Sequence, residues 1–464
     1  ERGFSVEGAR RACANGVAYA GGGRRWSPRQ TAEFMNALQR FLREETRLGI
    51  PALGIGEALH GFMAPGSTSF PQAIALASTW DPDLVEKVLA VAAAEMRVRG
   101  VHLALTPVLD LARDPRWGRT EETYGEDPYL AAVLGVAAVR GLQGRGPAID
   151  RRHVLATAKH FAVHGQPEGG TNVAPGNYAE RVIREQFLRP FQAAVQEAGV
   201  ACVMASYNEI NGIPSHVNRW LLRDVLRREW GFRGIVISDG WGVNDLVRLH
   251  HVAETYAEAA RKALQAGIDL ELGTCFAELV QEVREQRVAE ATLDAAVARV
   301  LSAKFTLGLF EDVYVDPDEA ERLTNCAAHR QLALEAAHKA IVLLKNEGNL
   351  LPLDAASLRT IAVIGPNAAD LHLGGYSADP GCGLSVLEGI RQRVGAHTRV
   401  LYAEGCRITE GVQGWAAWNE DAVVPGDPAE NAARIAQAVR VAQEADVALV
   451  VVGDNESTCR EGWS

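Results

Sequence analysis

Several features that define other classes of protein are missing from this sequence of 464 residues. No run approaches the ~18 consecutive apolar residues of a membrane-spanning helix, so no membrane partner is expected. The net charge is −11 and no basic block stands out, so nucleic acid is not an expected partner. There is no HExxH, no GxSxG and no glycine-rich phosphate loop; Gly21 to Gly23 are expected to lie in a loop that does not join a strand to a helix. These absences favour an uncharged substrate and a protein without metal or organic cofactor.

The seven cysteines form no CxxC pair, and their number is odd, so neither a zinc site nor a disulfide framework is expected. Their scatter slightly favours a cytoplasmic location, with a periplasmic or secreted one left open. The first residues, Glu1 to Phe4, do not resemble a signal peptide. The apolar fraction of 47% and the charged fraction of 23% are ordinary for a globular protein, and they leave a homo-oligomer open.

Strand and helix patterns alternate from the N-terminus to residue 312. Apolar runs at 101–105, 154–158 and 235–237 predict buried strands, and helical spacing at 82–98 and 129–142 predicts helices. Such alternation implies a parallel sheet with crossover helices, and its length predicts a (β/α)8 TIM-like barrel over residues 1–312. Further strands are expected at 49–55, 200–204 and 268–272, and further helices at 29–46, 179–198, 216–229, 253–266, 276–285 and 290–306.

A second α/β domain is predicted at 359–464, after a linker at 313–358. Apolar runs at 361–364, 400–402 and 447–452 predict its strands, and helical spacing predicts a helix at 428–444. A doubly wound unit rarely ends on a loop. We therefore expect an α/β sandwich that is truncated here and a protein that continues past Ser464.

Polar side chains follow the predicted strands at the points where the strands end. Asp239 ends the most distinctive stretch, in which three β-branched residues at 235–237 lead into Ser-Asp-Gly-Trp-Gly. Taken alone, Asp239 is equally well read as the cap of the next helix. Because the carboxyl ends of barrel strands meet on one face, a shared site is the better interpretation for the whole set. Its members are Glu57, Arg119, Lys159, His160, Tyr207 and Asp239.

These residue types suit the binding of a sugar ring. Carboxylates, cations and a phenol can hydrogen-bond its hydroxyls, and the indole of Trp241 can pack against its C–H face. Asp239 can attack an anomeric carbon, and hydrolysis then needs a second carboxyl group about 5–5.5 Å away as acid and base in retaining enzymes. Glu461, in a glycine-flanked loop after the strand at 447–452, is favoured for that role over Glu456.

Longer segments resemble glycoside hydrolase family 3, the β-glucosidase and β-xylosidase family. The resemblance implies a barrel followed by an α/β sandwich, with Asp239 as the nucleophile and Glu461, in an Arg-Glu-Gly sequence, as the acid/base. It also implies a sugar subsite lined by Glu57, Arg119, Lys159, His160, Met204 and Tyr207. The matching segments are Glu57-Ala58-Leu59-His60-Gly61, Phe70-Pro71-Gln72, Asp114 to Arg119, Glu121 to Pro128, Lys159-His160-Phe161, Met204 to Asn208 and Gly234 to Asp239.

The sequence departs from the family pattern at two positions in the barrel. Gly240 separates Asp239 from Trp241, where the family usually has Trp directly after the nucleophile, so the indole is expected to stack differently. Thr171 stands where many relatives have Arg, so one sugar contact is lost or supplied elsewhere.

Other polar residues have simpler interpretations. His60 and His102 are expected to be packed histidines and not acids. Trp117 is expected to brace the Arg119 loop, Glu122 to be exposed or to pair with that arginine, and Asp110 to cap a loop.

The leading functional hypothesis is a retaining, exo-acting β-glucosidase that releases terminal glucose from β-linked glucosides or short oligosaccharides. A β-xylosidase or α-L-arabinofuranosidase is the near alternative. A β-N-acetylglucosaminidase is disfavoured because residues 166–172 contain no Asp-His dyad, and a phosphorylase is disfavoured by Glu461. A sugar-binding protein without turnover is the alternative from a different class.

Overall fold

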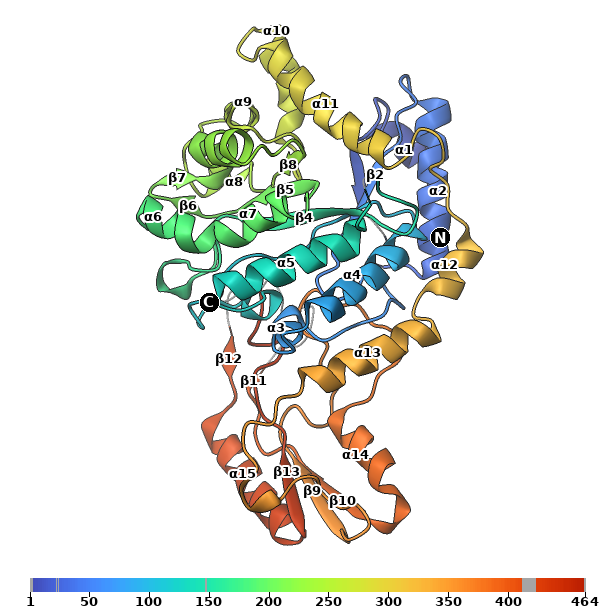
Figure 1. The fold of residues 1–464 in the computed structure, drawn as a ribbon, viewed down its shortest axis with the longest axis vertical. Coiled ribbons are helices and arrows are strands. Elements are labelled where there is room, and N and C mark those ends of the chain that lie inside the picture. Colours follow the sequence, from blue (N-terminus) through green and yellow to red (C-terminus); the bar gives the residue numbers. More distant parts are fainter. Residues whose placement is uncertain (1–2, 22, 24, 147, 411–422, 463–464) are drawn as a thin grey trace. The chain divides into compact units, whose positions relative to one another are not determined.

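The computed structural model describes residues 3–462 except 22, 24, 147 and 411–422. It divides into two compact units (Figure 1). Unit 1 comprises residues 1–340 and the short segment 376–380, and unit 2 comprises 341–375 and 381–464. Each unit is described by itself, and the boundaries expected at 312 and 358 stay predictions. Among the described residues, no helix has both the length and the apolar character needed to cross a membrane.

Unit 1 is built on a parallel sheet in the strand order β1-β2-β3-β4-β5-β8. Leu270 adds a single bridge to Ile237 at the β8 edge, so the strand expected at 268–272 is reduced to one bridge. The α/β fold class is confirmed, with six regular strands and this bridge among the described residues. The strands are β1 (Tyr19–Gly21), β2 (Leu53–Gly56), β3 (Leu103–Ala104), β4 (Leu155–Phe161), β5 (Cys202–Ala205) and β8 (Ile235–Ile237); β6 (Glu209–Ile210) and β7 (Ile213–Pro214) form a small hairpin.

Strand β1 corrects one expectation. It pairs with β2 and is followed by helix α2, so Gly21 ends a strand and Gly23 lies between that strand and a helix, while Gly22 lies outside the described residues. Three residues are too few to display strand periodicity, which is why the sequence pattern did not reveal β1.

Three long helices of unit 1 share one local start signal. Ser27, Asp81 and Asp127 each accept a backbone N–H with the side chain, and a proline follows at the first helical position. A proline costs nothing at this position, because the N–H that it lacks would have no partner within the helix, and its fixed φ suits a helix. The helices are α1 (Val6–Ala12), α2 (Pro28–Glu45), α3 (Ala73–Ala77), α4 (Pro82–Arg97), α5 (Pro128–Gln143), α6 (Glu180–Val182), α7 (Arg189–Gln196), α8 (Asp245–Arg248), α9 (Tyr256–Ala266), α10 (Leu279–Arg284), α11 (Glu290–Thr306), α12 (Pro317–Leu323) and α13 (Ala327–Ala340).

Two predicted helices are less regular than expected. The segment 179–198 is divided into α6, a π-helical stretch at Ile183–Phe187 and α7, which has Pro190 in its first turn. Pro190 has no N–H to donate to the preceding turn, which disrupts the regular ladder there. The segment 216–229 contains a π-helix at Trp220–Glu229.

Alternating strand residues build two cores in unit 1. Leu103, Leu155 and Met204 belong to an inner cluster inside the curved sheet. Ala104 and Ala156 belong to the larger outer cluster, which the helices cover. Because both faces of the strands are buried, the strands read as continuous apolar runs and not as alternating patterns.

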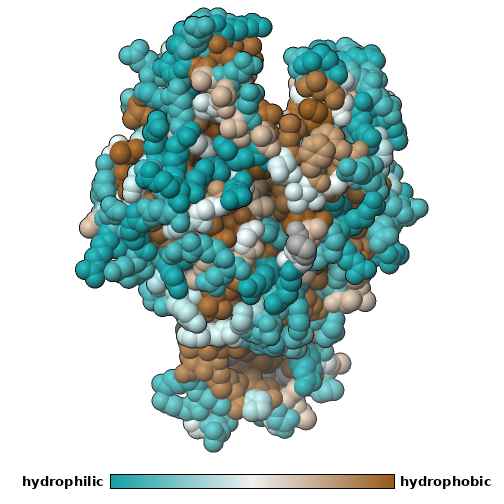
Figure 2. Space-filling view, turned by 45° about the horizontal axis from the view of Figure 1, so that its top comes forward, coloured by the Kyte–Doolittle hydropathy of each residue, from teal (hydrophilic) through white to brown (hydrophobic). Residues whose placement is uncertain are grey.

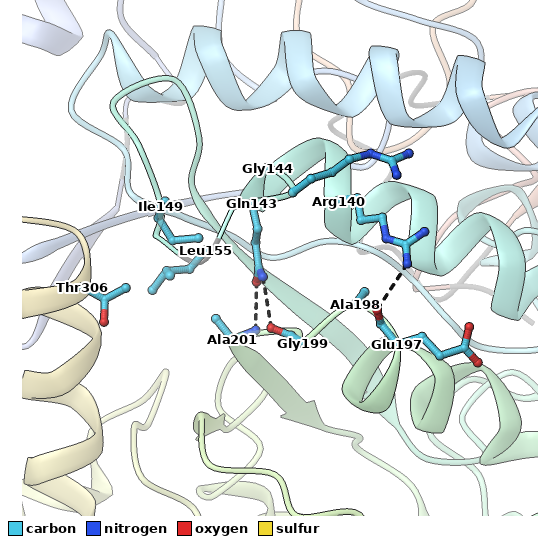
Figure 3. Close-up of a pocket in the computed structure, with 12 residues that line it drawn as sticks. Arg140, Gln143, Gly144, Ile149, Leu155, Glu197, Ala198, Gly199, Ala201 and Thr306 are labelled. Atoms are coloured by element: carbon cyan, nitrogen blue, oxygen red, sulfur yellow. Dashed lines mark hydrogen bonds between the residues drawn. The ribbon is translucent and has the colours of Figure 1, made fainter.

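A cavity of about 520 Å³ lies at the amino-terminal ends of β4 and β5 (Figure 3). Gln143 projects from the end of α5 into this region and accepts N–H hydrogen bonds from Ala156 and Ala201. Its amide donates to the carbonyl of Gly199, and Arg140 donates to that of Glu197. The polar side chains of this cavity thus complete the backbone hydrogen bonding of the strand ends.

Unit 2 contains a parallel sheet in the order β10-β9-β13. Its elements are β9 (Thr360–Ile364), α14 (Val386–Val394), β10 (Arg399–Ala403), β11 (Thr409–Glu410), β12 (Val424–Pro425), α15 (Pro428–Gln443) and β13 (Val447–Val450). Apolar side chains such as Leu344, Val450 and Val452 are exposed on this unit, and Figure 2 shows hydrophobic surface there beside the mostly hydrophilic surface of unit 1.

Candidate active site

Asp239 lies two residues after the end of β8, with Ser238 between them, and its side chain is 14% exposed. Its N–H donates to Nε2 of His216 at 3.1 Å, and its Oδ1 accepts from the N–H of Gly240 at 2.7 Å. Helix α8 begins only at Asp245, so the interpretation of Asp239 as a helix cap is wrong. Burial, with a smaller effect from His250, lowers the pKa of His216 to about 3, so its neutral ring can accept this hydrogen bond.

Arg119 is the centre of a buried polar group that we call the Arg119 cluster: Asp110, Arg119, Glu122, His160 and His164. The guanidinium is 1% exposed. It pairs with both carboxylate oxygens of Glu122, at 2.9 and 3.0 Å. It also lies 3.2 Å from Nε2 of His164 and 3.1 Å from Nε2 of His160. Because a guanidinium can only donate, both histidines must accept through Nε2.

The two histidines of the cluster are therefore neutral, with the proton on Nδ1. Burial first, and then the nearby Arg119, holds the pKa of each well below its usual range. Nδ1 of His160 donates to Oδ2 of Asp110 at 2.7 Å, and the same oxygen accepts the His160 backbone N–H at 3.0 Å. Burial raises the pKa of Asp110 to about 7. Asp110 thus selects the tautomer of His160 that Arg119 requires.

His160 connects the cluster to Asp239. Its Nε2 lies 3.6 Å from Oδ2 of Asp239, which is longer than a hydrogen bond. Since Nε2 carries no proton, His160 contributes a polar wall beside Asp239 and not an ion pair.

A second buried pair links β4 to the end of β2. Nζ of Lys159 donates to Oε2 of Glu57 at 2.8 Å, and both residues are buried. The ring of Tyr376 lies 5.0 Å from Lys159 Nζ and 5.9 Å from the Arg119 guanidinium carbon. A ring at these distances stabilises both cations through its negative face.

The remaining predicted residues occupy different environments. Tyr207 donates its hydroxyl to the carbonyl of Gly240 at 2.8 Å, so it supports the loop that carries Asp239. Trp241 is 55% exposed and has a positive φ of 63°, so its indole projects into solvent in unit 1. Met204 is 1% exposed and belongs to the inner core. The structure therefore brings Tyr207 to the Asp239 loop, leaves Trp241 exposed, and places Met204 in the packed interior.

The interpretations of several neighbours can now be checked. His60 is packed as expected, between the carbonyl of Phe70 and the hydroxyl of Ser377. His102 is buried and accepts from the N–H of Gly54, which confirms that it is a packed histidine. Glu122 pairs with Arg119, one of its two expected roles. Asp110 is not a simple loop cap, because it holds the ring of His160.

Trp117 braces the polypeptide near the cluster, as predicted. Its indole N–H donates to Oδ1 of Asn172 at 2.9 Å, and its ring lies edge-on to His164. Thr171, which replaces the arginine of many relatives, is exposed.

Sequence reasoning missed four residues that shape the site: Asp110, His164, His216 and Tyr376. His164 and His216 do not directly follow a predicted strand, so the strand-end criterion could not select them. Tyr376 lies in the short segment that returns to unit 1 from a distant part of the chain. Of the four, only Asp110 could have been selected from the sequence, because it lies in the loop Pro-Val-Leu-Asp that follows the strand predicted at 101–105.

The loop 453–462 of unit 2, which carries Glu461, is called the Glu461 loop. It follows β13 and is linked to the loop after the neighbouring strand β9. Asn367 donates to the carbonyl of Gly453 at 3.0 Å and accepts from the amide of Asn455 at 3.0 Å. His372 Nδ1 lies 3.0 Å from Oε2 of Glu456.

The environment of Glu456 makes it a poor general acid. Burial raises its pKa, but the hydrogen bond from His372 opposes this and the pKa lies below the usual value. The same hydrogen bond raises the pKa of His372. A general acid needs a raised pKa, so this pairing favours Glu461 over Glu456 for that role. Among the described residues, no group of three or more His, Cys, Asp or Glu is arranged to hold a metal ion.

Unit 1 is a curved parallel sheet with buried charged residues at the ends of its strands, and a second α/β unit follows it in the chain. These features define the class of two-domain α/β barrel proteins. Comparison with known families makes this more specific. The model described as "Glycosyl hydrolase family 3 N terminal domain" matches residues 16–303, and that described as "Glycosyl hydrolase family 3 C-terminal domain" matches residues 341–464. The chain belongs to glycosyl hydrolase family 3.

Individual relatives agree with this assignment. A β-xylosidase of Formosa agariphila is 40% identical over 440 residues, which covers 90% of this chain and 58% of the relative. A solved β-glucosidase from Erythrobacter marinus has a TM-score of 0.91 and 42% identity, over 97% of this chain and 60% of that one. A β-glucosidase from Listeria innocua, solved with glucose, has a TM-score of 0.80 and 33% identity, over 94% and 56%. The chain therefore spans a little under three fifths of the first curated relatives, at 56–58% of their length.

Proposed function

We propose that the protein is a retaining, exo-acting β-glycosidase of the β-glucosidase type. The observation that carries the proposal is the position of Asp239 at the end of β8, 3.6 Å from His160 and next to the Arg119 cluster. A carboxylate among buried hydrogen-bonding groups has the surroundings that a nucleophile and a sugar ring require. The relatives named β-glucosidase and the family membership support the same reaction class.

The proposed reaction has two steps. A carboxylate oxygen of Asp239 attacks the anomeric carbon while the bond to the leaving oxygen breaks and Glu461 gives that oxygen a proton. Water then attacks the same carbon, Glu461 takes its proton, and the bond to Asp239 breaks. Lys159 and Glu57 are proposed to hydrogen-bond the hydroxyls of the sugar, and the neutral ring of His160 is proposed to line the same subsite as a polar wall. Each step inverts the configuration at the anomeric carbon, so the two together retain the β configuration, and neither step needs a metal or cofactor.

A β-xylosidase is the second candidate, because the Formosa agariphila relative carries that name. Initial rates on an aryl β-glucoside and an aryl β-xyloside, measured side by side with the full-length protein, decide between the two. Faster glucoside turnover supports the main proposal. Faster xyloside turnover moves the assignment to β-xylosidase, and no turnover of either sugar contradicts both.

The nucleophile is tested by covalent labelling. An activated 2-deoxy-2-fluoro glycoside is expected to form a stable ester with Asp239, which mass spectrometry of the digested protein locates. Asp239→Asn should not be labelled, whereas Asp224→Asn, a surface carboxylate paired with Arg228, should be labelled like the wild type. A label on any other carboxylate contradicts the assignment of Asp239.

The acid/base is tested by azide rescue. Glu461→Gln is expected to hydrolyse an activated aryl glycoside slowly, and added azide should accelerate it and give a β-glycosyl azide. Glu456→Gln is the matched control, because Glu456 lies in the same loop but is paired with His372. Rescue of Glu456→Gln in place of Glu461→Gln would exchange the two roles.

A further inference from the structure

A second cavity of unit 1, of about 600 Å³, lies at the amino-terminal ends of β3 and β4. Arg97 and His102 come from the segment that leads from α4 into β3, and Arg151 and Arg152 come from the loop before β4. In a parallel sheet this is the end opposite to the carboxyl ends that carry Asp239. The cavity is therefore separate from the proposed glycosidase site.

Arg97 is a buried cation with incomplete hydrogen bonding. It is 8% exposed, and its Nη2 donates to the carbonyl of Leu307 at 3.1 Å. Its Nη1 is buried and has no hydrogen-bond partner among the described residues. Burial, together with the charge of Arg151, lowers the pKa of Arg97 to about 10. Asp150 and Asp312 act on Arg97 only from a distance, and no described residue forms an ion pair with it. A buried guanidinium without such a pair is unfavourable, and an anion would supply both the pair and the missing hydrogen bond.

His102 provides a second donor in the same cavity. Its Nδ1 accepts the N–H of Gly54 at 3.0 Å, so the neutral ring carries its hydrogen on Nε2. Burial, and then the charges of Arg97 and Lys304, keep the ring neutral by lowering its pKa well below the usual value. No acceptor for Nε2–H occurs within the part of the chain that the structure describes.

The carboxylates that line the cavity are already engaged. Asp312 pairs with Arg151, and Glu319 pairs with Arg322 at 2.9 Å. Asp316 accepts the N–H of Asp318 at the start of α12. Arg152 also lines the cavity, and it forms no ion pair with any described residue. The donors that remain available are thus on Arg97, His102 and Arg152, of which two are positively charged and one is neutral.

The cavity of Figure 3 has a similar volume but does not share this imbalance. There Gln143 and Arg140 donate to backbone carbonyls, and Gln143 also accepts two N–H groups. In the cavity of Figure 3 the polar side chains complete the backbone hydrogen bonding of the fold, whereas in the second cavity Nη1 of Arg97 and Nε2 of His102 have no acceptor among the described residues.

We propose that the cavity at the amino-terminal ends of β3 and β4 binds an oxyanion of the phosphate class through Arg97, His102 and Arg152. A phosphate oxygen accepts from guanidinium and imidazole N–H groups, and arginine is well suited to its geometry. The anion is free phosphate or the phosphate group of a small ester, whose organic part would lie against Val313 and Tyr314, which also line the cavity.

Calorimetric titration of the full-length protein with inorganic phosphate tests the proposal at pH 7.5, with ionic strength held constant by sodium chloride. We expect saturable binding with a Kd of about 1 mM or tighter. Arg152→Gln and Arg97→Gln should each weaken binding about tenfold or more, as expected when one charged hydrogen bond is lost. Arg140→Gln, in the cavity of Figure 3, is the matched control and should bind phosphate like the wild type.

The outcomes separate the proposal from its alternatives. No saturable binding to the wild type, or equal weakening in all three variants, would overturn the proposal. If Arg97→Gln fails to fold, Arg152→Gln decides the question. The Arg152 side chain is exposed, so without phosphate this variant should unfold at the same temperature as the wild type. A parallel titration with phenyl phosphate identifies the source: tighter binding than inorganic phosphate indicates an ester, and equal or weaker binding indicates free phosphate.

Discussion

The surroundings of the two proposed catalytic residues, each taken within its own unit, are built differently. The Arg119 cluster of unit 1 is almost completely buried, and its members fix one another through direct hydrogen bonds. The Glu461 loop of unit 2 is partly exposed, and Asn367 and His372 link it to the loop after β9. The difference indicates that the surroundings of Asp239 are fixed by the folding of unit 1, whereas Glu456 is positioned by a link between two loops of unit 2.

The largest expected effect is on the reaction itself. Asp239→Asn removes the nucleophile and should lower kcat on an aryl β-glucoside by roughly 10³-fold or more, as for other enzymes that lose a covalent nucleophile. Asp224→Asn should retain the wild-type rate. Steady-state kinetics measure both, and a loss of less than tenfold in Asp239→Asn would contradict the proposed role.

The second effect tests how much of unit 1 depends on the Arg119 cluster. Arg119→Met removes the guanidinium that pairs with both carboxylate oxygens of buried Glu122, and should lower the free energy of unfolding by about 3–5 kcal/mol. Arg116→Met is the matched control, since Arg116 pairs with Asp114 through two hydrogen bonds but is 65% exposed. That control should cost less than about 1 kcal/mol. Urea unfolding measures both, and equal losses would show that burial is not what distinguishes the cluster.

The third prediction uses the raised pKa of Asp110, which is about 7. Below this pH the carboxyl takes up a proton, which weakens the hydrogen bond that Oδ2 accepts from Nδ1 of His160 and with it the preference for the tautomer that accepts from Arg119. Activity should therefore fall as the pH drops through about 7. Asp110→Asn has no such titration.

The pH profile of kcat/KM measures this effect in wild type and Asp110→Asn. The variant should lose the limb near pH 7, and its maximal kcat/KM should be roughly 10- to 100-fold lower, as when other histidines lose an orienting carboxylate. An unchanged limb in the variant would assign it to a different group.

The smallest expected effect lies in unit 2. The hydrogen bond between Glu456 and His372 lowers the pKa of Glu456 and raises the pKa of His372. The stabilisation of the folded state by this ion pair is complete between pH 4.5 and pH 6.5, which are the ordinary pKa values of a glutamate and a histidine. It disappears as the pH rises through the raised pKa of His372 or falls through the lowered pKa of Glu456. His372→Gln should therefore cost about 1 kcal/mol near pH 5.5 and less at pH 9.

Thermal unfolding at the two pH values measures this window. His397→Gln, an exposed histidine of the same unit, should show no such difference. Hydrolysis of a glucoside with a poor leaving group should also slow by a few fold in His372→Gln, because only that reaction needs the proton from Glu461. An equal effect on an activated aryl glucoside would indicate a general loss of structure.

The sequence by itself determined the regular elements and the family. Long helices with a side-chain cap and a proline, such as α4 and α5, were predicted within a few residues, because their signals lie in adjacent residues. The strand-end criterion selected Lys159, His160 and Asp239, since the direction of a parallel strand fixes which end its last residue occupies.

Only the tertiary structure decided which partners these residues have. These partners come from segments far apart in the chain. Such contacts decide the pairing of Lys159 with Glu57, the return of Tyr376 to unit 1 and the proton positions on His160 and His164. The short strand β1 and the single bridge at Leu270 likewise depend on a neighbouring strand. A residue's type is local, but its burial, charge state and hydrogen-bond partner are set by groups that folding brings next to it, and the sequence pattern around it does not encode them.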